Sequence, residues 1–290
     1  MKQLFSILVL YCSIISSAQS GSEIYLFDLK IKDGQVFLSN GINITNHKGY
    51  DNQPFFHPSQ PIIYYSSFND SNRSDIKFYN YQTKETNNLT TTNDREYSPT
   101  VTPDENYISC IIQRDNGAQD LGKYPIGGGD PIVFINTLKI GYHAWASNDK
   151  LILFVLGDSS TNTLHIYDLA KKTDLVIAKN IGRSLHKIPG QDAMSFVQKI
   201  TDTTSVITRL DPSTGATSPL AYTIKGSDHL TWLQNNIILM SNGTVLFTSS
   251  TGKDAAWKPA IVQGDATMLK GVTRLAVNKE NTKLAVVVSE

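Results

Sequence analysis

Short apolar runs separated by polar turns fill most of the chain, and apolar and polar positions alternate within many of these runs. In Ser98–Ile111 an apolar stretch meets a Pro-Asp turn at Pro103 and Asp104, and an alternating stretch follows. Alternation over a few residues is typical of β-strands. A helical interpretation fails, because no segment keeps a 3.6-residue apolar period over three turns. The pattern therefore predicts an all-β protein made of short strands.

The strand–turn–strand pattern recurs along the chain. Its copies are Pro54–Tyr65, Ser98–Ile111, Ala144–Phe154, Lys187–Phe196, Thr231–Met240 and Ala276–Val286. The residues before the turns, which we call the anchors, are Phe56, Val101, Trp145, Ile188, Trp232 and Val277. Successive anchors are 45, 44, 43, 44 and 45 residues apart. Such even spacing indicates an internal repeat.

A second strand pair lies between successive copies. Its members include Asp75–Asn80, Leu164–Asp168, Val206–Asp211 and Val245–Phe247, each with a polar turn nearby. Four short strands in roughly 44 residues are typical of one blade of a β-propeller. Five such blades fit inside the chain.

The two ends of the repeat region complete each other. Glu23–Asp28 and Val36–Leu38 match the third and fourth strands of a blade, whereas Thr273–Val288 matches only the first two. Together they predict a sixth blade, with inner strands from the C-terminus and outer strands from the N-terminus. This pairing removes sheet edges that would otherwise be open to aggregation. The fold predicted is a six-bladed propeller with four antiparallel strands per blade.

Two motifs resemble those of the TolB-like or PD40 (WD40-like) family of β-propellers. One is the turn Pro99-Thr100-Val101-Thr102-Pro103-Asp104, and the other is the strand Asp75-Ile76-Lys77-Phe78-Tyr79. The resemblance extends over essentially all of the chain after residue 20, although only Val101–Ile111 is a close match. It implies an exported six-bladed propeller. Members of the family bind proteins, carry peptidase domains or act on sugars, so the resemblance implies fold more than function.

Residues 1–20 are typical of a secretory signal peptide. Lys2 precedes the apolar run Phe5–Ile15, and Ser16–Ser20 supplies the small residues of a cleavage site. We expect cleavage after Ala18 or Ser20, a single propeller domain at 21–290, and a periplasmic or secreted protein; the alternative is an N-terminal anchor. Cleavage leaves Cys110 alone, which predicts no intramolecular disulfide. We expect a monomer with no membrane span in the mature chain.

Composition and charge narrow the function. The 290 residues hold 26 Lys and Arg against 26 Asp and Glu, so no basic surface for nucleic acid is expected. No Gly-x-Ser-x-Gly elbow of a hydrolase occurs. Gly117–Lys123 resembles a phosphate-binding loop, but Tyr124 stands where Ser or Thr would hold magnesium. We interpret Gly127–Gly129 and Asp115–Asp120 as plain turns.

Three histidines occupy nearly the same repeat position. His143 and His186 lie two residues before their anchors, and His229 lies three before its anchor. The corresponding positions of the other blades hold Gln53, Glu96 and Arg274, with Tyr97 and Tyr142 nearby. First strands line the channel of a propeller, so these side chains are predicted to ring one channel mouth.

The leading hypothesis is a non-catalytic module of the cell envelope that holds a protein partner or a small polar ligand at this ring. No organic cofactor is expected. The alternative is that His143, His186 and His229 hold a divalent metal, since neutral imidazole is a common ligand. In that case Glu96 would act as a base and Arg274 would pair with a carboxylate substrate. Such a site would resemble that of the sugar-acid lyases built on related propellers. A third hypothesis is a purely structural protein.

Three further side chains have structural interpretations. Trp145 and Trp232 are anchors and are predicted to pack between sheets. Trp257 either faces solvent or caps a neighbouring blade, and His57 is interpreted as a turn residue.

Overall fold

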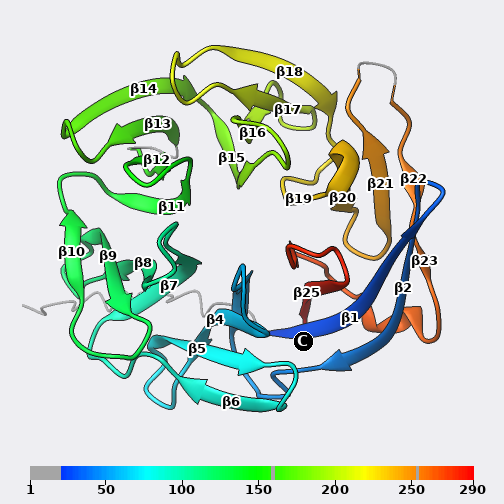
Figure 1. Cartoon of the computed structure of the whole chain (residues 1–290), viewed down its shortest axis with the longest axis horizontal. Helices are drawn as coiled ribbons and strands as arrows, with labels where there is room; N and C mark the ends of the chain where they lie inside the picture. The colour runs from blue at the N-terminus through cyan, green and yellow to red at the C-terminus, as the bar shows by residue number, and fades with distance from the viewer. Residues whose placement is uncertain (1–20, 158–160, 253–254) are drawn as a thin grey trace, which may run out of the picture.

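The computed structural model describes residues 21–157, 161–252 and 255–290. The predicted signal peptide lies outside the described residues. Six β-sheets are arranged around a central axis, with the first strand of each sheet innermost (Figure 1). Neighbouring strands within a blade are antiparallel, as predicted. The six-bladed propeller is thereby confirmed.

Blades 1 to 3 follow one another along the chain. Blade 1 consists of β3 (Asp51–Phe56), β4 (Ile62–Phe68), β5 (Ser74–Asn80) and β6 (Glu85–Asn88). Blade 2 consists of β7 (Arg95–Val101), β8 (Tyr107–Gln113), β9 (Gln119–Pro125) and β10 (Ile132–Ile135). Blade 3 consists of β11 (Ile140–Trp145), β12 (Lys150–Val155), β13 (Thr163–Asp168) and β14 (Thr173–Lys179).

Blades 4 and 5 repeat the arrangement. Blade 4 consists of β15 (Ile181–Lys187), β16 (Met194–Lys199), β17 (Ser205–Leu210) and β18 (Thr217–Tyr222). Blade 5 consists of β19 (Leu230–Leu233), β20 (Ile237–Ser241), β21 (Leu246–Ser250) and β22 (Lys258–Pro259). Short 3₁₀ turns lie at Gln234–Asn236 and Ala266–Met268.

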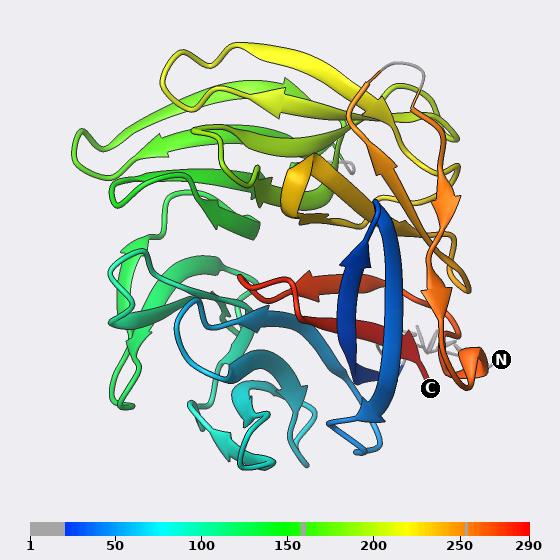
Figure 2. The same cartoon turned by 45° about the vertical axis from the view of Figure 1, so that its right-hand side comes forward.

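Blade 6 is built from both ends of the described chain, as the sequence predicts. Its inner strands are β24 (Arg274–Val277) and β25 (Lys283–Ser289), and its outer strands are β1 (Ser22–Lys32) and β2 (Gln35–Asn43). A fifth strand, β23 (Ile261–Val262), was not predicted; it leaves blade 5 and pairs in parallel with β2 (Figure 2). The last blade is thus held by three separate segments of chain.

The core lies between the blades rather than inside them. In the described residues the buried apolar side chains form six clusters, and each cluster joins two neighbouring blades. Strand β25 shows the principle: Leu284 and Val286 pack towards blade 5, and Ala285 and Val287 pack towards blade 1. Side chains on opposite faces of a strand alternate, so one buried strand supplies two interfaces.

Several single-residue predictions are met. Trp232 is buried in the cluster between blades 4 and 5, and Trp145 is half-buried against the cluster between blades 2 and 3. Trp257 caps its neighbour, because its indole nitrogen donates to the carbonyl of Tyr222 at 3.2 Å. His57 is a turn residue whose Nδ1 accepts the backbone N–H groups of Ser59 and Gln60.

Cys110 is a free thiol in β8, with none of its surface exposed. It packs in the cluster between blades 1 and 2. Burial raises the pKa of this thiol well above its ordinary value. Among the described helices, none is long and apolar enough to cross a membrane.

Candidate functional site

A small cavity lies between the first strands of all six blades. We call it the narrow end of the channel; its volume is about 120 Å³. Its polar lining residues include Gln53 and Ser98 from blades 1 and 2, Tyr142 and His143 from blade 3, Arg183 and His186 from blade 4, His229 from blade 5 and Arg274 from blade 6. Every blade therefore contributes to one site.

A larger cavity of about 580 Å³, the wide mouth, lies beside the turns that follow the first strands. Its lining includes Pro58, Pro103, Trp145, Lys187 and Lys279. His143 and His186 line both the wide mouth and the narrow end. The two cavities are therefore parts of one channel, and these two histidines lie where they meet.

Five of the six predicted ring residues line the narrow end: Gln53, His143, His186, His229 and Arg274. Glu96 does not. Its carboxylate is fully buried and accepts hydrogen bonds from Thr92 at 2.6 Å and from Tyr124 at 2.9 Å. Burial is the main cause that raises the pKa of Glu96.

The misplacement of Glu96 has a local physical cause. The pairing of β7 with β8 shifts register between Tyr97 and Thr100, and Ser98 takes a left-handed φ of 56°. A bulge of this kind adds a residue to one strand, so positions counted back from the anchor Val101 across it are offset. Ser98 consequently faces the channel in place of Glu96. In blade 1 the equivalent residue, Gln53, has φ 59° at a similar shift, and its side-chain oxygen accepts the Ser98 N–H at 2.7 Å.

Arg274 crosses the channel. Its Nη2 donates to the Tyr142 hydroxyl at 2.8 Å, and its guanidinium lies over the Tyr142 ring at 5.2 Å. Its Nη1 lies 2.6 Å from a ring nitrogen of His229. Arg274 belongs to blade 6 and Tyr142 to blade 3, which stand opposite each other in a ring of six. One side chain therefore links both sides of the lumen.

All three histidines are neutral at neutral pH. Burial lowers the pKa of His143 to about 3 and that of His186 to about 4. For His229, burial and then the nearby charges of Arg274 and Arg183 lower the pKa to about 2. A neutral imidazole both donates and accepts a hydrogen bond, so the ring offers dipoles rather than charge.

The alternative of a metal ion held by His143, His186 and His229 finds no support in this arrangement. In the described part of the chain no three His, Cys, Asp or Glu residues are grouped as a metal ion would need. The Nε2 of His143 is 2.8 Å from the Ser109 hydroxyl, and His229 faces the Arg274 guanidinium. A cation so close to His229 repels a second cation.

Besides Ser98, two participants were not predicted from the sequence. Arg183 lines the narrow end, but the pairing of β15 with β16 shifts between Ile181 and Leu185, which hides Arg183 from counting along the repeat. Ser109, on β8, contacts both His143 and Trp145. A serine in the middle of an apolar strand is the only sequence signal for that role.

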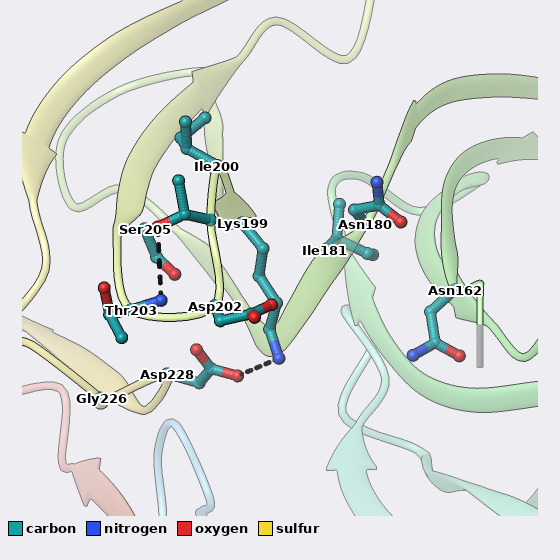
Figure 3. Close-up of a pocket in the computed structure, with 11 residues that line it drawn as sticks. Asn162, Asn180, Ile181, Lys199, Ile200, Asp202, Thr203, Ser205, Gly226 and Asp228 are labelled. Carbon is teal, nitrogen blue, oxygen red and sulfur yellow. Dashed lines mark hydrogen bonds and ion pairs between the residues drawn. The ribbon is translucent and has the colours of Figure 1, made fainter.

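A third hollow of about 530 Å³, the blade 4 hollow, is lined chiefly by residues of blade 4 and of the loop that follows it (Figure 3). Figure 3 shows Lys199 reaching Asp228, and their charged atoms are 2.9 Å apart. Asn162 and Asn180 lie on the other side of this hollow. Asp228 directly precedes His229, so the two sites share one loop.

No protein-family model and no curated protein matches the chain. Solved structures match throughout its length. A putative TolB from Agrobacterium tumefaciens is 10% identical, with TM-score 0.66, and the match covers 94% of this chain and 99% of that one. TolB from Acinetobacter baumannii is 12% identical with TM-score 0.57; 92% of this chain matches, and it spans only 63% of that protein.

An oligogalacturonate lyase in complex with manganese is 11% identical with TM-score 0.57, and the match covers 94% of this chain and 98% of the lyase. At such identities the likeness shows the fold alone. The fold is a six-bladed β-propeller, similar to that of the TolB structures.

Proposed function

We propose that this protein is an exported, non-catalytic binding module of the cell envelope, with a ligand or protein partner held in the channel. The proposal rests chiefly on the continuous channel, because the wide mouth and the narrow end meet at His143 and His186. Concave sites lined by a few convergent polar groups are the usual binding sites of proteins. The signal-like residues 1–20 and the TolB-like fold support export.

Site-specific photo-crosslinking in the native host tests this proposal. A benzophenone amino acid replaces Lys187 at the wide mouth, and the matched control replaces Leu175, which is exposed on the outer strand β14. We expect discrete crosslinked adducts from position 187 and none from position 175. If the ligand is small, we expect native mass spectrometry to show it co-purified with the protein. Equal adducts from both positions, or neither adduct nor ligand from Lys187, would contradict a channel-binding role.

The second candidate is a metal-dependent, carbohydrate-active lyase. The likeness to the oligogalacturonate lyase structure with manganese favours it, whereas the contacts of His143 and His229 with Ser109 and Arg274 do not. Metal analysis of the purified mature protein separates the two. Stoichiometric metal that is lost from a His186→Ala variant would support the lyase, and wild-type thermal stability after chelation would support the binding module.

A further inference from the structure

The narrow end holds positive charge that nothing in its lining balances. Arg183 and Arg274 line it, and the described lining residues include no Asp or Glu. Three other arginines are paired with carboxylates: Arg73 and Arg95 contact Asp115, and Arg114 contacts Asp94. Arg183 is exposed, whereas Arg274 is half-buried. Protein walls screen charge less than water does, so the unpaired charge of Arg274 is the costlier of the two.

The neutral histidines cannot supply the missing negative charge. His186 and His229 are uncharged at neutral pH for the reasons given above. A neutral imidazole can donate a hydrogen bond to an anion through its N–H group, and it carries no negative charge that would repel the anion. The site therefore combines two fixed cations with neutral donors.

Arg274 is held by weak partners. The Tyr142 hydroxyl, at 2.8 Å, and the neutral His229 ring are its hydrogen-bond partners in the described residues. Hydrogen bonds between a guanidinium and a carboxylate or phosphate are roughly twice as strong as those between neutral groups, and the planar fork of arginine suits both anions. An arriving oxyanion would outcompete both partners.

We propose that the narrow end binds the terminal oxyanion of a ligand, a carboxylate or a phosphate, through Arg274 and Arg183, and that Arg274 leaves Tyr142 and His229 when it does so. This inference rests on the proposed binding function and names the ligand class. The cavity of about 120 Å³ is well below the roughly 300–1,000 Å³ of pockets that enclose a whole drug-sized ligand. It therefore accepts one charged group, and the remainder of the ligand lies outside it.

Nuclear magnetic resonance of the mature protein tests the inference. Protein labelled with ¹⁵N at histidine and arginine is titrated at low ionic strength with succinate, with inorganic phosphate, and with neutral succinamide as the matched control. We expect saturable shifts of the Arg274 and His229 signals with an anion and none with succinamide. Comparing succinate with phosphate identifies which oxyanion is preferred.

Variants assign the effect to the site. Arg274→Gln should weaken anion binding at least about tenfold, since a charge-assisted hydrogen bond is lost. Arg183→Gln should weaken it less and serves as the second test if Arg274→Gln does not fold. Arg209→Gln, on β17 and outside the narrow-end lining, should bind as the wild type does.

Two outcomes overturn the inference: neither anion binds saturably, or succinamide binds as well as succinate. Unchanged affinity in both Arg274→Gln and Arg183→Gln overturns it as well. Channel crosslinks that persist despite such a result would leave the proposed function standing. Anion binding together with crosslinks equal at Lys187 and Leu175 would support the anion site and remove the partner role.

Discussion

Ser109 fixes the protonation of the histidine beside it. Its hydroxyl donates to the Thr100 carbonyl at 3.0 Å, and its oxygen accepts the Trp145 indole N–H at 2.9 Å. The 2.8 Å contact with His143 must then be a donation from His143 Nε2–H, because the serine proton is already engaged. His143 is thus a neutral Nε2–H tautomer, and its Nδ1 is left as a buried acceptor without a partner.

Replacing Ser109 with alanine should destabilise the fold by about 1–3 kcal/mol, because two N–H donors lose their acceptor. Urea unfolding followed by tryptophan fluorescence measures the change. Ser147→Ala is the control, since that exposed hydroxyl bonds, among the described residues, only to Asp149 in the turn after β11. Equal stability of the two variants would refute the role given to Ser109.

The buried histidines should make the protein sensitive to acid. The pKa of His143 is about 3 when folded, against 6.5 for an ordinary histidine. Below pH 6.5 the unfolded chain therefore binds a proton that the folded chain does not, and stability falls as pH falls. Between pH 7 and pH 5 this residue alone accounts for about 2 kcal/mol.

The variant His143→Gln, which keeps a side-chain N–H but does not titrate, should lose correspondingly less stability over that range. Urea midpoints at pH 7 and pH 5 give the comparison. A pH dependence identical to that of the wild type would show that His143 already titrates normally in the folded protein.

At the scale of the strand, indole–serine bonds tie neighbouring blades. Trp145 of blade 3 donates to Ser109 of blade 2, and Trp232 of blade 5 donates to Ser195 of blade 4 at 2.8 Å. In both cases the tryptophan is an anchor and the serine lies in the second strand of the preceding blade. Two copies of the repeat therefore share this contact as well as the spacing of their anchors.

The outer strands are exposed edges whose side chains make few buried contacts. In β14 the side chains of Leu175 and Val176 are 54% and 51% exposed. A Val176→Lys change should leave the unfolding free energy within about 0.5 kcal/mol of the wild type and reduce aggregation, because lysine protects a sheet edge. Chemical unfolding and light scattering measure both. A large loss of stability would mean that another surface covers this strand.

The elements show where sequence reasoning works. Anchors such as Trp232 stand at fixed spacing because the hairpin around them is local, so blades could be counted from the chain. Bulges are not visible in the spacing, which is why Glu96 was assigned to the channel and Ser98 was not. The contact of Arg274 with Tyr142 and the pairing of β23 with β2 join distant segments, and no local pattern encodes them.

For the whole molecule, stability depends on closing the ring. No blade described here has a core of its own, because each apolar cluster is shared by two blades. Strand β25 lies between β24 and β1 and feeds two of these clusters. Opening the ring at blade 6 therefore exposes two interfaces at once.

Deleting residues 283–290, which include β25, should abolish cooperative unfolding and give a chain that aggregates or is degraded. Near- and far-ultraviolet circular dichroism and limited proteolysis report the result. As a control, cutting the turn at Gly128 between the outer strands β9 and β10 should leave the fold intact, because the inner strands stay closed. A folded deletion variant would show that five blades suffice.

Because Cys110 is buried between blades 1 and 2, its alkylation reports on the separation of these blades. Alkylating reagents attack the thiolate, and this thiol is both inaccessible and held in its protonated form. Reaction therefore has to wait until blades 1 and 2 part. The described residues hold no second cysteine. The rate at which one label is added therefore measures how often the blades separate, and no probe has to be engineered.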